Sequence, residues 1–207
     1  GDSCIAEAGH RMGDQYSVQE NLMLNPTVWD AMAEAYEKTE GDLIDKLIAA
    51  LEAAEKEGGD IRGRQSAAIL VVKAESSGKP WEDKVIDLRV EDHQEPVKEL
   101  KRLVKIHRAY EHMNKGDEYF TRKDVESALR EYELAEKLAP DNAEIIFWKA
   151  VTMAGVDMVD EALPAFKKVF SMDPNWAILL PRLPKSGLLP DDPGLIKKIL
   201  SVQKKKK

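Results

Sequence analysis

The sequence contains a single cysteine, Cys4, among 207 residues. No internal disulfide can form, so nothing in the chain requires an oxidising compartment. It also lacks an uninterrupted apolar run of about 18 residues, the length expected of a membrane-spanning helix. No signal peptide is visible. These absences lead us to expect a cytoplasmic protein without a membrane partner.

Acidic residues outnumber basic ones: the chain has 38 Asp and Glu and 31 Lys and Arg, which gives a net charge of −7. A nucleic-acid-binding protein would need a basic face, so we expect no nucleic-acid partner. The run Lys204–Lys207 is basic, but four lysines at a terminus are typical of a disordered tail. The apolar fraction of 43% suffices for packed cores.

Two helices are predicted in the first half of the chain. Apolar residues at helical spacing over Val28–Tyr36 follow Asn25 and Thr27, either of which can cap a helix. A second helix begins at Asp42 and ends at Gly58, because glycine adopts the left-handed conformation of a helix cap without strain.

Four segments of the first half resemble strands. Short pieces lie around Ser3–Ala6 and Tyr16–Leu22. Ser66–Val72 is a continuous apolar run rich in branched residues, which predicts a strand buried on both faces. Val85–Glu91 alternates between apolar and charged residues, as a half-buried strand does. We expect the last two strands to pair antiparallel.

The second half contains an internal repeat. A pattern of small residues, large apolar or aromatic residues and proline at six positions is repeated 34 residues later. The six pairs are Gly116 and Ala150, Tyr119 and Met153, Ala128 and Ala162, Tyr132 and Phe166, Ala135 and Val169, and Pro140 and Pro174. The small residues let two helices approach closely, the aromatic residues fill the space beside them, and the prolines end the second helix. The pattern resembles two tetratricopeptide repeats. The proline-rich segment that follows, with a short final helix, is typical of a terminal cap.

The turn between the second helix and the buried strand carries more polar side chains than a turn needs. Asp60, Arg62, Arg64 and Gln65 lie there among glycines, directly before Ser66. The arginines could hold a substrate carboxylate or oxyanion, with Gln65 or Ser66 donating a hydrogen bond. Alternatively, Asp60 and Arg62 pair with each other and with the backbone to fix the turn.

Several polar motifs occur together in the order seen in one family. They are Cys4 with Ala8-Gly9-His10, Tyr16–Asn21, Gly59–Ala68, Asp87–His93 and the segment Leu183-Pro184-Lys185-Ser186-Gly187-Leu188-Leu189-Pro190. In these motifs residues 1 to 105 and the tail resemble the domain of unknown function 1028 family, which has an Ntn-hydrolase-like fold. The resemblance implies an N-terminal nucleophile and a hydrolase.

In the family pattern, a segment about as long as the matching residues 1 to 105 precedes Cys4, and this segment carries the nucleophile. Because residue 1 is Gly rather than Met, we expect residues to be missing upstream. Gly1 has no side chain and cannot act as the nucleophile, so this chain alone is expected to be inactive. Glu20 also stands where the family usually has Gly, which would hinder a close backbone approach.

The expected site therefore joins motif residues to the polar turn. Gln65, Ser66 and His10 are the catalytic candidates, and Asp60, Arg62, Arg64 and Asn21 are the substrate-binding candidates. Arg62 is expected to act mainly on structure.

Metal and thiol chemistry are weighed as alternatives. His10 and His93 with Asp92 or Glu91 could bind zinc, which some members of the family suggest, but the sequence has neither an HExxH motif nor a cysteine pair. We therefore expect no metal and no cofactor. Cys4 is expected to be a small buried residue rather than a nucleophile.

The predicted fold class is α+β. Residues 1–105 are expected to form a partial Ntn-hydrolase-like domain made of helices and a short antiparallel sheet. Residues 106–203 are expected to form an all-α tetratricopeptide-repeat-like domain. Residues 204–207 form the tail. Two functions stay open: amide-bond hydrolysis that depends on the upstream segment, and a non-catalytic interaction module. We expect a homo-oligomer or a companion N-terminal segment. The repeats would pack on the first domain or on another subunit, or they would bind a peptide.

Overall fold

The computed structural model describes residues 4–203, and the predicted Lys204–Lys207 tail lies outside this range. The fold is α+β, with eight α-helices and two small antiparallel sheets within the described range. The chain divides after Val104 into two compact units. No helix in residues 4–203 is long and apolar enough to cross a membrane.

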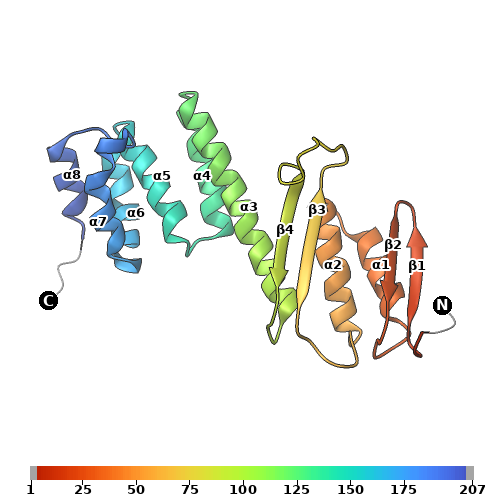
Figure 1. The fold of residues 1–207 in the computed structure, drawn as a ribbon. Helices are drawn as coiled ribbons and strands as arrows, with labels where there is room; N and C mark the ends of the chain where they lie inside the picture. Colours follow the sequence, from red (N-terminus) through yellow and green to blue (C-terminus); the bar gives the residue numbers. More distant parts are fainter. Residues whose placement is uncertain (1–3, 204–207) are drawn as a thin grey trace. The chain divides into compact units, whose positions relative to one another are not determined.

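The first unit contains two antiparallel hairpins (Figure 1). β1 (Gly9–Gly13) pairs with β2 (Tyr16–Glu20), and β3 (Ala67–Val72) pairs with β4 (Lys84–Val90). The antiparallel pairing predicted for the last two strands is confirmed, with Ala67 opposite Val90 and Ile69 opposite Leu88.

The beginning of the chain differs from the prediction. Cys4–Ala6 is not a strand, and Ser3 lies outside the described residues. β1 lies instead in the glycine-spaced stretch that follows, where the sequence signal for a strand is weak. Cys4 is exposed rather than buried, because Cys4–Ala6 lies outside the two described sheets.

Two helices, α1 (Val28–Lys38) and α2 (Leu43–Lys56), pack against each other beside the hairpins (Figure 1). Asp42 caps α2 as predicted, and Asp45 completes a capping box. The expected caps of α1 act elsewhere. Asn25 donates from Nδ2 to the carbonyl oxygen of Glu57 at 2.7 Å, and Thr27 Oγ1 donates to Glu57 Oε2 at 2.9 Å. These bonds tie the start of α1 to the end of α2.

β3 is buried on one face only, which contradicts the expectation of two buried faces. Ile69 is buried, but Leu70 and Val72 are 54% and 55% exposed. The apolar core of this unit lies on the inner face alone and comprises Ile44, Ile48, Ile69, Ile86, Val90, Leu100 and Val104. The sequence of β3 is apolar on both sides, and the described residues supply a covering layer for one.

The second unit is a repeated helix pair. α3 (Pro96–Thr121) begins in the first unit and is followed by α4 (Val125–Leu138), α5 (Ala143–Gly155) and α6 (Val159–Met172). The predicted 34-residue period extends to the turns between the paired helices. Lys123 and Asp157 both have positive φ, at 64° and 63°. Asp124 donates to the Tyr119 carbonyl at 3.0 Å, and Met158 donates to the Met153 carbonyl at 3.0 Å.

The C-terminal segment covers the last helix pair. α7 (Asn175–Leu179) leads into two short 3-10 turns, Leu180–Arg182 and Pro184–Ser186, and then into α8 (Pro193–Leu200). The core contains Phe147, Phe166, Phe170, Leu180, Leu183, Leu189 and Ile199. The segment thus buries apolar residues of the second helix pair, as expected of a cap.

Helix approach in the second unit can be tested with a matched pair of glycines. A Cβ at Gly116 would lie 2.9 Å from the ring of buried Tyr132, whereas a Cβ at Gly155 meets nothing within 4 Å. Alanine favours a helix over glycine by up to about 1 kcal/mol. We therefore expect Gly155→Ala to stabilise the second unit by about 0.5 kcal/mol and Gly116→Ala to destabilise it by about 1 kcal/mol. Urea denaturation followed by NMR signals of this unit measures both. A stabilising Gly116→Ala would contradict the close approach.

Candidate functional site

The polar turn that follows α2 is closed mainly by its own side chains. The Arg62 backbone N–H and Nε donate to Asp60 Oδ1 at 2.8 and 2.9 Å, and Arg62 Nη2 donates to Oδ2 at 2.5 Å. The bound guanidinium lowers the pKa of the Asp60 carboxyl to about 2. Both groups are thereby occupied in fixing the turn, which matches the structural role considered for them.

The remaining residues of this turn contact other segments of the first unit or are exposed. Arg64 forms an ion pair with Glu55 of α2. The Gln65 carbonyl accepts a hydrogen bond from the His93 backbone N–H at 2.9 Å, so it joins the strand entry to the segment after β4. The side chains of Gln65 and Ser66 are exposed, and β3 begins only after them.

Asn21 lies near this turn, and His10 lies on a separate hairpin. The segment after Asn21 runs antiparallel to the turn, since Ile61 donates to the Leu22 carbonyl at 2.9 Å and Leu24 donates to the Gly59 carbonyl at 2.9 Å. His10 sits in β1 opposite Gln19 and is exposed. Asn21, Asp60 and Arg62 therefore lie on adjoining segments, while no recorded hydrogen bond or ion pair links His10 to them.

Three of the histidines contact separate partners. His93 Nδ1 accepts from the Glu95 backbone N–H at 2.9 Å, just before α3 begins. His107 lies 3.7 Å from Glu111, and His112 lies 2.7 Å from Glu131. Across residues 4–203 no three His, Cys, Asp or Glu side chains are grouped so that they could hold a metal ion.

Glu20 is partly buried and carries an ionisable group that the sequence did not identify as a site. It lies at the end of β2 opposite Gly9, and its side chain shares a face with buried Val18. Neither carboxylate oxygen has a hydrogen-bond partner, and both are inaccessible to solvent. Burial raises the pKa of Glu20 to about 7. A carboxyl group with such a pKa can donate or accept a proton near neutral pH.

A groove opens on the second unit and offers about 630 Å³. It is lined by Met113, Asp117, Phe120 and Thr121 of α3, Tyr132 of α4, Trp148, Val151, Thr152 and Gly155 of α5, and Gly187, Leu188, Leu189 and Pro190. We call it the α3–α5 groove. The last four residues belong to the Leu183–Pro190 motif. This motif therefore forms one wall of the groove, a role that its sequence did not reveal.

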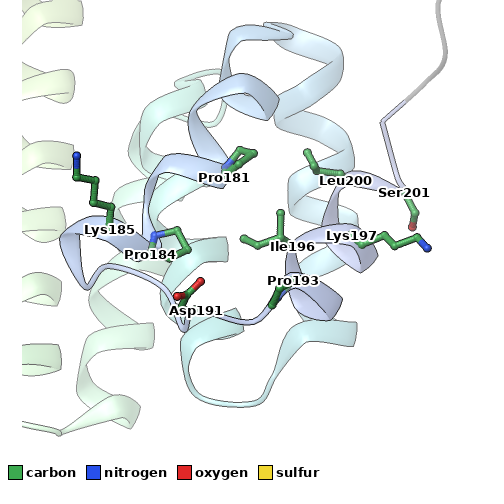
Figure 2. A pocket seen from close by; sticks show the side chains of 9 residues that line it. All are labelled: Pro181, Pro184, Lys185, Asp191, Pro193, Ile196, Lys197, Leu200 and Ser201. Atoms are coloured by element: carbon green, nitrogen blue, oxygen red, sulfur yellow. The ribbon is translucent and has the colours of Figure 1, made fainter.

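A second hollow, of about 880 Å³, lies at the C-terminal end of the same unit. Figure 2 shows Pro181 and Pro184 on one side of it and Ile196 and Leu200 on the other, with Lys185 and Lys197 extending away. Ser201 at its rim donates from Oγ to the Lys198 carbonyl at 2.6 Å. Asp191 and Pro193 complete the lining, so the hollow combines apolar walls with a carboxylate.

A comparison with known families matches part of the chain. Residues 1–100 match a family described as "Family of unknown function (DUF1028)". The match supports the resemblance seen in the polar motifs of the first unit. Searches among curated proteins and among solved structures found no match.

The buried carboxyl of Glu20 predicts a specific pH dependence of stability. Its pKa is raised from 4.5 to about 7 on folding, so the folded state retains a proton that the unfolded state releases. The contribution of Glu20 to the stability of the first unit should be fully present below pH 4.5 and be lost as pH rises through 7. Because Glu20 is only partly buried, we expect a loss of about 1 kcal/mol rather than the full shift.

Glu20→Gln should remove this slope, because glutamine does not titrate. Urea denaturation between pH 5 and 8.5, followed by NMR signals of the first unit, measures it. The exposed Glu40 provides the matched control, and Glu40→Gln should leave the slope unchanged. An identical slope in Glu20→Gln and the parent protein would contradict the assignment.

Proposed function

We propose that the chain is a protein-interaction module whose second unit binds a short peptide segment of a partner in the α3–α5 groove. The observation that carries this proposal is the apolar lining of a groove built on two helices of the repeated pair. Phe120 and Leu188, both lining residues, are 36% and 51% exposed. Apolar side chains left accessible in a groove are typical of a binding surface.

The repeat supports this function. Helix pairs that recur after 34 residues, with small residues where the helices cross, resemble tetratricopeptide repeats, and such arrays bind peptides through their helix faces. The groove is too short for a long extended ligand, so a segment of a few residues fits best. In the first unit, by contrast, Asp60, Arg62 and Arg64 are already paired within the unit.

Peptide selection tests the proposal. Short random peptides displayed on phage should yield binders to the intact chain. Gly155→Leu would weaken them at least about tenfold, because a side chain at this open position occupies the groove. Ser171→Leu adds the same side chain on α6, away from the groove, and should leave binding unchanged. Binders that are insensitive to Gly155→Leu, or a selection without binders, would contradict the proposal.

A second function, amide-bond hydrolysis, is favoured by the bare face of β3. Leu70 and Val72 are apolar and exposed on the side opposite the core. A second layer of sheet would bury them, as in the Ntn-hydrolase-like sandwich that the family resemblance implies. In this reading a companion segment supplies both that layer and the nucleophile, and Gln65 and Ser66 act beside it.

Intact-mass measurement and N-terminal sequencing of the protein from its native source test this second function. A companion chain or upstream segment that begins with Thr, Ser or Cys is the expected result, because the nucleophile of such hydrolases is the first residue of a chain. A native product that begins at Gly1 and has no companion chain would rule hydrolysis out.

A further inference from the structure

The floor of the α3–α5 groove carries a chain of hydrogen bonds that ends in one carboxylate. Thr152 Oγ1 donates to the hydroxyl of Tyr132 at 3.5 Å, and that hydroxyl donates to Asp117 Oδ1. Burial, together with the bond to Asp117, raises the pKa of Tyr132 far above its ordinary value. The phenol therefore stays protonated at neutral pH and acts as a neutral donor to Asp117.

Among the described residues that line the groove, Asp117 alone has an acidic or basic side chain that is charged at neutral pH. The other lining residues are apolar or uncharged at neutral pH, and none of them is a lysine or arginine. The Oδ2 atom of Asp117 accepts no hydrogen bond recorded within residues 4–203, and the residue is exposed. A ligand that brings a cation to this atom would therefore displace no cation of the groove itself.

The same lining suits the apolar stem of a cationic side chain. Phe120 and Trp148 line the groove on α3 and α5 and offer aromatic surface to methylene groups or to the cation itself. A different groove of this unit shows the contrast. It is lined by Lys149, Lys168 and Glu136, and both lysines already pair with that glutamate.

We propose that the α3–α5 groove selects a lysine or arginine side chain of the bound peptide, with its charge at Asp117 and its stem against Phe120 and Trp148. This inference rests on the proposed function of the groove. It adds the chemical class of the ligand, namely a cation on an apolar stem. An acidic or purely aliphatic segment would lack a partner for Asp117.

Three small probes with the same six-carbon chain isolate the charge: n-hexylammonium, hexan-1-ol and hexanoate. NMR titration of the full chain, read at the amides of Thr152 and Gly155, gives their affinities. We expect hexylammonium to bind about fivefold more tightly than hexanol, and hexanoate to bind most weakly. Asp117→Asn should abolish the preference, while asparagine still offers Tyr132 a hydrogen-bond acceptor.

Glu118→Gln is the matched control, because it removes one negative charge from the next residue of α3, which does not line the groove. It should preserve the preference. Unchanged amide signals of α6 in Asp117→Asn would confirm that the variant folds. Equal binding of all three probes would overturn the cation inference but leave a peptide groove intact. No binding by any probe would overturn the inference, and a peptide selection without binders would overturn the proposed function as well.

Discussion

The second unit depends on one close contact between helices. Gly116 of α3 has no side chain, and the ring of Tyr132 on α4 occupies the space where a Cβ would lie. This approach buries the ring almost completely and brings its hydroxyl to Asp117, one residue further along α3. A packing requirement, which concerns the volume of one glycine, therefore also fixes the position of the polar groups in the groove.

The helices and the repeat could be predicted from the sequence because their determinants are local. Capping of α2 at Asp42 involves residues three positions apart, and the inter-helix turns recur because each helix pair closes in the same way. β4 could be predicted equally well, since its apolar and charged residues alternate as the buried and exposed faces of a strand do.

Burial was less predictable because it depends on what the fold places over a residue. β3 has the sequence of a strand with two buried faces, and α2 and α3 cover one of them. Cys4 has the small apolar character of a core residue, yet it lies outside the two described sheets and is exposed. Glu20 shows the opposite case. A charged residue is expected at the surface, but the alternation of β2 turns its carboxylate inward beside Val18.

The same distinction explains why the most polar stretch of the sequence is not the most open site. Asp60 and Arg62 are two residues apart, so the turn brings opposite charges together and each satisfies the other. Asp117 bonds instead to Tyr132, a neutral donor, and this bond leaves the carboxylate charge uncompensated. A carboxylate that keeps its charge at the edge of an apolar groove has more binding capacity than one that is neutralised by its neighbour. Composition alone does not distinguish these two carboxylates, because it counts polar groups without counting their partners.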